Sequence, residues 1–282
     1  VFLLWLEFTA VIIGDPLPFD GKIREQADGS YIAYMNPVTG VSNHASFLEQ
    51  FPNSAPFELG LAWFSGAKEE ANKCAIVYSR LPRNSDQWTD PMVISVRNNY
   101  SNQNPVLFYD NTSDILHCFH SQAPAESGES EAQIWHLQSD NYGANWTEPK
   151  PLFTFPGAFP RNRIIPAVSP NANGVLFPIY NSANNTPIIA KSSNRDLGDR
   201  SSWQLHAIQN AEDLVQPSVI RLPNNYPKLK AYFRDRRRIA IYEATSSDDG
   251  VSWETPYSFQ LPNPNVAIQA NVLQPVMNGG PI

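Results

Sequence analysis

A short motif ending in tryptophan recurs four times and constrains the fold of this chain more than any other feature. Two copies follow the pattern Ser-x-Asp/Asn-x-Gly-x-x-Trp, from Ser139 to Trp146 and from Ser246 to Trp253. Looser copies end at Trp88 and Trp203, so the four tryptophans are separated by 58, 57 and 50 residues. The pattern predicts a tight turn between strands, because Asp or Asn hydrogen-bonds the backbone, Gly supplies a positive φ, and Trp packs beneath the turn.

Apolar runs keep the same order around each copy of the motif. In the second unit they cover residues 104–110, 115–122, 132–139 and 151–155, with the turn before the last run. A unit of about 50 residues with four short strands is typical of a propeller blade, which buries its faces only against neighbouring blades. Four units, a partial unit before His44 and a fifth beginning at Val266 predict a single all-β domain over residues 1–282. We expect a β-propeller of about six four-stranded blades, incomplete at the C-terminus.

Composition agrees with many short strands and excludes some functions. Charged residues make up 17 % of the chain and there are 25 prolines, which argues against a helical bundle. The net charge of −7 disfavours a nucleic-acid partner. The chain has two cysteines, Cys74 and Cys118, too few for a disulfide scaffold. They lie in neighbouring predicted strands, where they either pair or remain as buried free thiols.

The N-terminal segment, residues 1–14, is apolar but is interrupted by Glu7. It is too short to span a membrane and lacks the basic start of a signal peptide. We expect it to form a first strand or to pair with the C-terminal end, in a chain that lacks residues of the full gene product. Four Asn-x-Ser/Thr sequences in turn-like segments favour glycosylation and an extracellular or secretory location. Their acceptors are Asn99, Asn111, Asn145 and Asn184.

Polar residues stand at equivalent positions in successive units. The first strand of each blade lines the propeller axis, and the antiparallel second strand ends on the face where the first begins. The starts of the first strands carry Asn43, His44, Gln103, Asn104, Arg161, Gln216, Asn263 and Asn265. The ends of the second strands carry His120, Tyr180, Arg234, Arg236 and Arg237. These side chains are therefore predicted to converge on one rim of the axis.

The residue types at this rim favour an anionic ligand. Arginines grouped in an acidic protein suit a carboxylate, which a planar guanidinium binds through two hydrogen bonds. His44 or His120 together with Tyr180 supplies groups for acid/base catalysis. The alternative is that these residues are structural. The arginines would then form surface salt bridges with Asp235, Glu212 or Glu243, and both histidines would form hydrogen bonds within the fold. The remaining histidines lack the register and are expected to be structural: His117, His136 and His206.

No pattern of a metal or cofactor site is found, so neither is expected. The chain has no His-x-x-x-His, no cysteine pair at zinc spacing and no glycine-rich phosphate loop. The few carboxylates predicted at the rim are chiefly Glu49 and Asp235.

Several segments resemble the sialidase-like family of propellers with BNR or Asp-box repeats, over nearly the whole chain. They are Asn43–Glu49, Ala62–Gly66, Ser101–Phe108, Gln216–Val219, Phe233–Arg237 and Leu261–Asn265. They are similar to the exo-α-sialidase-like branch, whose relatives act on rhamnose linked to glucuronate as lyases or hydrolases. The resemblance implies a catalytic role for His44, and uronate binding by Arg161 and the cluster Arg234–Arg237. Sialidases carry Arg-Ile-Pro near the start, where this chain has Lys22-Ile23-Arg24, and use a Tyr/Glu pair as nucleophile.

The sequence thus predicts a carbohydrate-active protein that binds a glycan with an acidic sugar in its axial pocket. As a lyase it would neutralise the uronate carboxylate, while His44 or Tyr180 removes the C5 proton. As a hydrolase it would need a pair of carboxylates. A non-catalytic glycan-binding or structural propeller is the alternative of a different class, and a true sialidase is a third. The oligomeric state is not predicted.

Overall fold

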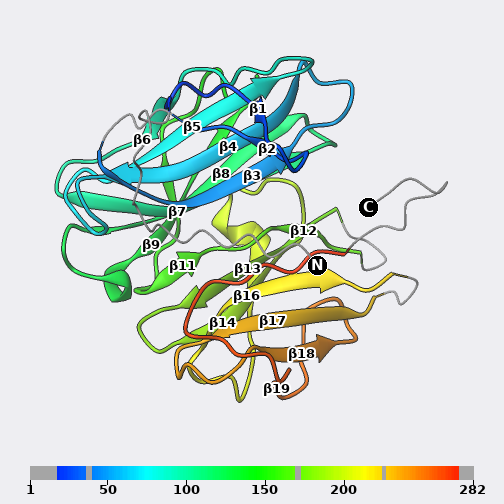
Figure 1. The fold of residues 1–282 in the computed structure, drawn as a ribbon. Helices are drawn as coiled ribbons and strands as arrows, with labels where there is room; N and C mark the ends of the chain where they lie inside the picture. The colour runs from blue at the N-terminus through cyan, green and yellow to red at the C-terminus, as the bar shows by residue number, and fades with distance from the viewer. Residues whose placement is uncertain (1–17, 36–39, 169–172, 224–226, 273–282) are drawn as a thin grey trace.

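The computed structural model describes residues 18–35, 40–168, 173–223 and 227–272, and these form short strands with two 3-10 turns (Figure 1). The strands of the first two blades are β3 (Ser42–Gln50), β4 (Phe57–Gly66), β5 (Ala75–Pro82), β6 (Met92–Ser95), β7 (Tyr100–Asp110), β8 (Ile115–Pro124), β9 (Gln133–Ser139) and β10 (Lys150–Phe153). Those of the next two are β11 (Ala158–Pro160), β12 (Ile165–Pro166), β13 (Val175–Asn181), β14 (Thr186–Ser192), β15 (Trp203–Ala207), β16 (Leu214–Arg221), β17 (Leu229–Asp235), β18 (Tyr242–Ser246) and β19 (Tyr257–Ser258). The two 3-10 turns are η1 (Glu129–Glu131) and η2 (Arg200–Ser202).

Each blade is an antiparallel meander in chain order. The first, second and fourth blades are the sheets β3–β6, β7–β10 and β16–β19. In the third, β11 and β12 together take the place of one inner strand, and both pair with β13. The blades coincide with the four repeat units expected from the sequence, so the all-β, propeller-type prediction is confirmed.

The tryptophan motifs form the predicted turns. In the second blade, Gly143 N–H donates to Ser139 Oγ at 2.8 Å, and Trp146 Nε1 donates to Gly143 O at 3.2 Å. The fourth blade repeats both bonds at 2.9 and 3.2 Å with Gly250, Ser246 and Trp253. The two glycines have φ of 81° and 84°, which an L side chain rarely adopts.

The inner strands of three blades share a bulge at the predicted polar positions. Pairing with the second strand shifts between His44 and Phe47, between Gln103 and Val106, and between Val215 and Ser218. The bulged residues Ala45, Asn104 and Gln216 have φ of 51°, 48° and 52°. A bulge re-aims the side chains beside it, and here it does so at equivalent places around the axis.

Apolar contacts between neighbouring blades hold the four blades together. One cluster runs through the first three blades and includes Phe64, Leu107, Phe119 and Phe177. A second joins the third and fourth blades. A third, small cluster packs Phe159, Tyr180, Val215 and Ala132 under the ends of the second strands. Burial of this apolar surface is the main stabilising contribution to such a fold.

Other expectations have mixed outcomes. The described residues form four blades and a separate hairpin, β1 (Arg24–Glu25) with β2 (Tyr31–Ile32), so the count of six blades is not confirmed. The segment expected to form a first strand, residues 1–14, lies outside the described residues. Cys74 and Cys118 are buried free thiols, the second of the two alternatives. No helix in the described part of the chain is long and apolar enough to cross a membrane.

Candidate functional site

A phenol, a carboxylate and a guanidinium from three different blades meet where the second strands end. Tyr180 ends the second strand of the third blade, β13. Its hydroxyl donates to Glu129 Oε2 at 3.4 Å, and Arg236 Nη2 donates to the same oxygen at 2.7 Å. Glu129 lies in η1, in the loop after β8, and Arg236 directly follows β17. We call Tyr180, Glu129, Arg161, Arg234 and Arg236 the arginine cluster.

Arg234 is oriented by two amide side chains. Its Nε donates to Asn265 Oδ1 at 2.7 Å, and its Nη1 is 3.3 Å from Gln216 Oε1. Gln216 is the bulged residue of β16, and Asn265 also has a positive φ, of 67°. These bonds leave Nη2 of Arg234 without a hydrogen bond to any described residue, and it remains free to bind a ligand.

Arg161 is half-buried and makes no hydrogen bond or ion pair with the described residues. Burial lowers the pKa of Arg161, Tyr180 raises it, and the neighbouring charge of Arg234 lowers it. Burial likewise lowers the pKa of Arg234, and Arg236 adds to the effect. Arginine stays charged in proteins, so both guanidinium groups carry a positive charge, and neither forms an ion pair with a described residue.

Tyr180 is held as a protonated phenol. Burial raises its pKa above the ordinary range, and the carboxylate of Glu129 raises it further. Its side chain is fully buried, whereas the side chains of Glu129 and Arg236 are 31 % and 27 % exposed. A ligand over the cluster would therefore touch Glu129 and Arg236 first, with the phenol beneath them.

Most of the amides predicted to bind substrate form contacts within the fold. Asn104 Nδ2 donates to Pro160 O of the next blade at 3.1 Å. Asn263 Nδ2 donates to Val266 O at 3.0 Å, and Asn43 accepts from Trp63 Nε1 at 3.1 Å. Gln103 is buried with its Nε2 unpaired among the described residues. Their roles in binding remain predictions, while Gln216 and Asn265 are in contact with the arginine cluster.

Neither of the two histidines predicted to be catalytic has a hydrogen bond or ring contact with Tyr180 in the described structure. His44 is exposed on β3, where its ring stacks on Phe64 with 5.5 Å between centroids. His120 is fully buried in β8, with Nδ1 3.0 Å from Ser121 O. Burial lowers the pKa of His120 to about 4, so it is a neutral group inside the blade. The catalytic roles of both histidines remain predictions. The burial of His120 argues against its role.

Four further charged residues lie outside the arginine cluster, and three of them were predicted at the rim: Arg237, Asp235 and Glu49. Arg237 pairs with the buried Asp235 at 2.7 Å, which is the structural alternative for this arginine. Asp235 accepts three further backbone hydrogen bonds, from residues 237, 239 and 240, so it is not a free rim carboxylate. Glu49 lies near the other end of β3, close to Arg163. Arg24, in the hairpin, pairs with Asp20.

Glu129 is the group that the sequence reasoning missed. It belongs to the loop Glu126-Ser-Gly-Glu-Ser-Glu131, between the second and third strands of its unit. No motif marks Glu129. However, its loop contains three glutamates and follows a second strand that ends at the rim, and this pattern could have predicted a carboxylate there.

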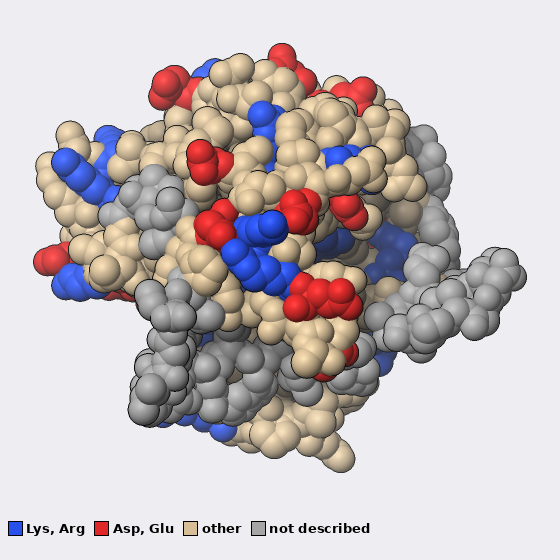
Figure 2. Space-filling model, turned by 45° about the horizontal axis from the view of Figure 1, so that its top comes forward, with Lys and Arg blue, Asp and Glu red and all other residues tan. Residues whose placement is uncertain are grey.

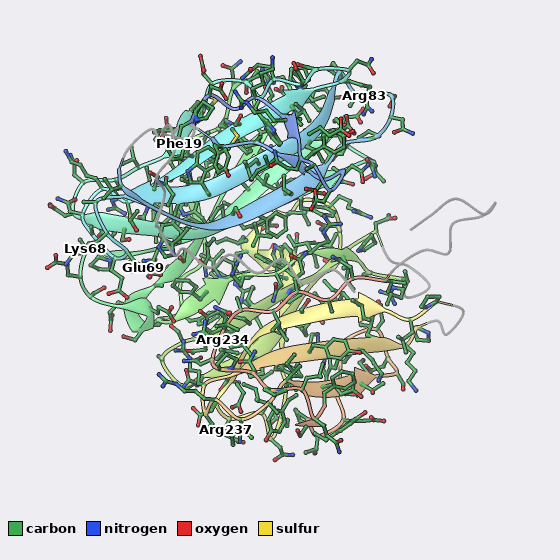
Figure 3. The ribbon with its side chains drawn as sticks, in the orientation of Figure 1. Phe19, Lys68, Glu69, Arg83, Arg234 and Arg237 are labelled. Carbon is green, nitrogen blue, oxygen red and sulfur yellow. The ribbon has the colours of Figure 1, made fainter. Side chains whose placement is uncertain are left out.

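Figure 3 places Glu69 and Arg234, from the first and fourth blades, on the same side of the molecule, away from Arg83.

The wider surface is mixed in charge. Basic side chains near the centre of the face in Figure 2 lie beside acidic ones. Within the described residues, no group of three His, Cys, Asp or Glu side chains is placed to hold a metal ion. All four predicted glycosylation acceptors are exposed.

Residues 58–278 match the family model described as the BNR repeat-like domain. The chain belongs to this family. The resemblance seen in the strand and turn motifs is thereby confirmed. No curated protein sequence matches the chain.

Solved structures with a similar fold include several sialidases. The NanB sialidase from Streptococcus pneumoniae superposes with a TM-score of 0.63 at 12 % identity, over 81 % of this chain and 55 % of that one. The intramolecular trans-sialidase from Ruminococcus gnavus gives 0.63 at 11 % identity, over 79 % and 71 %. The Hadza microbial sialidase Hz136 gives 0.59 at 14 % identity, over 80 % and 48 %. At these identities the similarity shows the fold alone, and the chain spans about half the length of two of these proteins.

Proposed function

We propose that this protein binds a glycan carrying a carboxylate, of the uronate type, at the arginine cluster. The observation that carries the proposal is Arg161, a half-buried guanidinium beside Arg234 that makes no ion pair with the described residues. Placing a charge in a partly buried site is costly unless a counter-charge is supplied. A ligand carboxylate supplies that counter-charge. Sialidase and exo-β-1,3-galactanase folds among the similar structures support a sugar as the rest of the ligand.

The geometry suits a carboxylate bridging two arginines. Arg234 is held by Asn265 and Gln216, so its free Nη2 costs little ordering on binding. Arg161 supplies a second set of donors. A charge-assisted hydrogen bond contributes about 1.5–3 kcal/mol, so two of them distinguish an acidic sugar from a neutral one by a large factor.

We further propose that the bound glycan is cleaved next to the uronate, at a rhamnose–glucuronate type of linkage. In an elimination, neutralising the carboxylate acidifies the C5 proton. A base removes that proton, the C4–O bond breaks, and the leaving oxygen takes a proton. Tyr180 is protonated and can donate through Glu129, while His44 is exposed and makes no hydrogen bond to the described residues. In a hydrolysis, Tyr180 with Glu129 would form the nucleophile pair.

A binding-only role is favoured by one specific contact. Arg236 holds the Glu129 carboxylate in an ion pair at 2.7 Å, and the phenol of Tyr180 is fully buried. The protein is also proposed to be secreted and to carry glycans on its exposed asparagines, because glycan binding and glycosylation both fit an extracellular location. The complete propeller is proposed to have six blades.

The proposal is tested by incubating the protein with a rhamnosyl-glucuronate oligosaccharide. Absorbance of the unsaturated uronate and the release of reducing sugar are followed together, and binding is measured by calorimetry. A rise in absorbance indicates a lyase, reducing sugar alone indicates a hydrolase, and binding without either supports the binding-only role. Turnover of a sialoside instead would identify a sialidase. His44→Ala retaining full activity would remove His44 from the mechanism.

A matched pair of variants assigns any binding to the cluster. Arg161→Met removes the unpaired guanidinium, and Lys68→Met removes an exposed charge whose partner is Glu126 at 3.4 Å. We expect the first to lose binding of the uronate and the second to retain it. Equal binding by both variants would contradict the proposal.

A further inference from the structure

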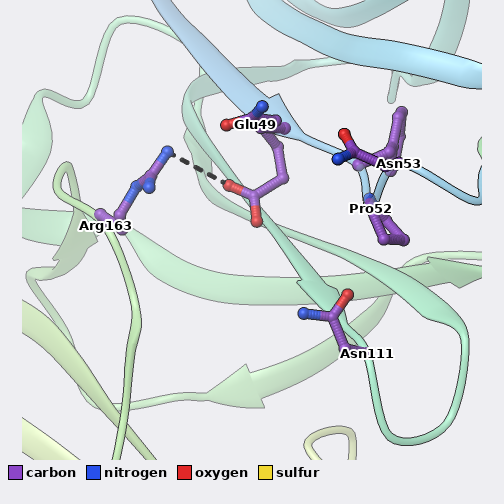
Figure 4. Close-up of a pocket in the computed structure, with 7 residues that line it drawn as sticks. Glu49, Pro52, Asn53, Asn111 and Arg163 are labelled. Carbon is purple, nitrogen blue, oxygen red and sulfur yellow. Dashed lines mark ion pairs between the residues drawn. The ribbon is translucent and has the colours of Figure 1, made fainter. Parts of the chain in front are cut away.

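A pocket lies between the first three blades, and none of its lining residues belongs to the arginine cluster (Figure 4). It has a volume of about 380 Å³ and is lined by Glu49, Gln50, Phe51, Pro52, Asn53, Asn111 and Arg163. The residues come from the end of β3 and the turn after it, from the turn after β7, and from the segment joining β11 to β12. The volume is near the lower end of the range for small-molecule sites.

A buried carboxyl group forms one wall of this pocket. Glu49 is 9 % exposed, and its Oε1 accepts the N–H of Tyr109 at 3.1 Å. Its Oε2 is 3.5 Å from Arg163 Nη2, which is longer than a good hydrogen bond. This oxygen therefore retains capacity to accept from a ligand.

The other polar side chains of the pocket are also free to bind. Gln50, Asn53 and Asn111 are exposed, and their side chains make no hydrogen bond with the described residues. Each amide has two donor hydrogens and an acceptor oxygen. The ring of Phe51 is 2 % exposed, so hydrogen bonds, rather than stacking on that ring, would select the ligand.

The charges in the pocket offset each other. When Glu49 is ionised, its carboxylate lies beside the guanidinium of Arg163, which is at the rim with 45 % of its side chain exposed, so the pocket carries no net charge that would attract an ion of either sign. A hydroxyl group is both donor and acceptor, so neighbouring hydroxyls satisfy the carboxylate, the amides and the guanidinium together. Because the lining residues include both donors and acceptors, a ligand with several adjacent hydroxyls fits better than one with a single polar group.

We propose that the pocket formed by Glu49, Asn53, Asn111 and Arg163 is a binding site for a neutral monosaccharide unit. None of the residues that line it belongs to the arginine cluster, and Arg163 pairs with Glu49 instead. The site does not depend on uronate binding or on catalysis. It gives the protein a second contact with a glycan, with a preference for neutral sugars.

Asn111 is also a predicted glycosylation acceptor, through Ser113. The sugar in the pocket is therefore either part of a separate glycan or the sugar attached to Asn111 itself. Ser113→Ala removes the acceptor sequence and keeps the Asn111 side chain. Protein carrying Ser113→Ala presents an open pocket in any expression host.

The test uses the full chain with Ser113→Ala and Arg161→Met, so that the arginine cluster does not contribute. D-Glucose, D-galactose and D-mannose are titrated by ligand-observed NMR, with D-glucuronate and D-glucosamine as the anionic and cationic probes. We expect at least one neutral sugar to bind more tightly than both charged probes. Adding Asn53→Ala, in an exposed turn, should weaken it about five- to tenfold, the size expected for one neutral hydrogen bond. Adding Glu49→Gln should weaken it about tenfold or more at pH 8.5, where the carboxyl group is ionised, because a charge-assisted bond is lost.

Two results would overturn the assignment. One is the absence of binding by all three neutral sugars. The other is binding that neither Asn53→Ala nor Glu49→Gln weakens, since the sugar then lies elsewhere. Glucuronate binding that Arg161→Met abolishes in the Ser113→Ala protein concerns only the arginine cluster, so failure of one site is distinguishable from failure of the other. If protein with its natural Ser113 carries a glycan at Asn111 and binds no free sugar, while the Ser113→Ala protein binds it, the attached sugar occupies the same pocket.

Discussion

The hydroxyl of Tyr180 lies 3.4 Å from Oε2 of Glu129, although the two residues are 51 positions apart and belong to different blades. The pair exists because the second strands of neighbouring blades end on the same face of the propeller. Arg236 shares the same carboxylate oxygen, so three blades are joined at one point. The neighbouring Arg161 has no such carboxylate partner among the described residues.

Removing Arg161 should not reduce stability. Its charge is half-buried and unpaired among the described residues, so Arg161→Met should leave the unfolding free energy unchanged or raise it by about 1 kcal/mol. Arg195→Met is the comparison: Arg195 pairs with the buried Asp110 at 3.2 Å, and its loss leaves a buried charge unpaired. We expect that variant to lose about 3 kcal/mol. Urea unfolding of both proteins measures the difference, and equal losses would show that Arg161 is a structural ion-pair residue.

Glycines of the two tryptophan turns should tolerate alanine unequally. Both have a φ near +80°, so each substitution carries backbone strain of about 1 kcal/mol. A Cβ at residue 143 would lie 2.2 Å from the ring of Tyr78, whereas the nearest atoms at residue 250 are 3.5 Å away. We expect Gly143→Ala to cost several times as much stability as Gly250→Ala. Thermal unfolding of the two variants provides the measurement, and a larger loss for Gly250→Ala would contradict the packing described.

Acid should destabilise the fold through buried histidines. Burial lowers the pKa of His120 to about 4, against an ordinary value of 6.5. Between these values the unfolded chain binds a proton that the folded chain does not, so stability is lost as the pH falls from about 6.5 to 4. His120→Leu should reduce that loss by up to about 1.4 kcal/mol per pH unit. Unfolding of both proteins at pH 7 and pH 5 measures the slopes, and parallel slopes would mean that His120 already titrates normally in the folded state.

The burial of Glu49 predicts the opposite pH dependence. Burial raises its pKa to about 7, while Arg163 and the N–H of Tyr109 oppose the shift. The folded chain then holds a proton that the unfolded chain releases, so this group costs stability as the pH rises from about 4.5 to 7. Glu49→Gln should gain stability relative to the natural protein across that range. A constant difference at pH 5 and pH 8 would show that the carboxyl is ionised throughout.

The sequence predicted the blades because their determinants are local. Ser139, Gly143 and Trp146 form a turn through contacts within eight residues, and the spacing of such turns defines each unit. The common rim was also predictable, since antiparallel strands of known order must bring Tyr180 and Arg234 to one face. The predicted number of six blades was not confirmed, since the described residues form four.

Side-chain environments were predicted less well because they depend on packing between blades. Asn104 lies at the predicted polar start of its strand but turns its amide to Pro160 O. His120 occupies a rim position along the chain, yet the neighbouring strands bury it completely. Glu129 has no sequence motif, and its role follows only from the approach of Arg236. Register along a strand thus predicts the face on which a residue lies, and the packing of the next blade decides whether it can reach a ligand.

The most direct test of the account is the affinity for D-glucuronate of the natural protein, Arg161→Met and Lys68→Met, measured by calorimetry at one ionic strength. If the unpaired guanidinium of Arg161 binds the ligand carboxylate, Arg161→Met should bind D-glucuronate about ten- to a hundredfold more weakly. Lys68→Met should bind it as the natural protein does. Equal affinities for all three proteins, with each correctly folded, would contradict the assignment of the arginine cluster as an anion-binding site.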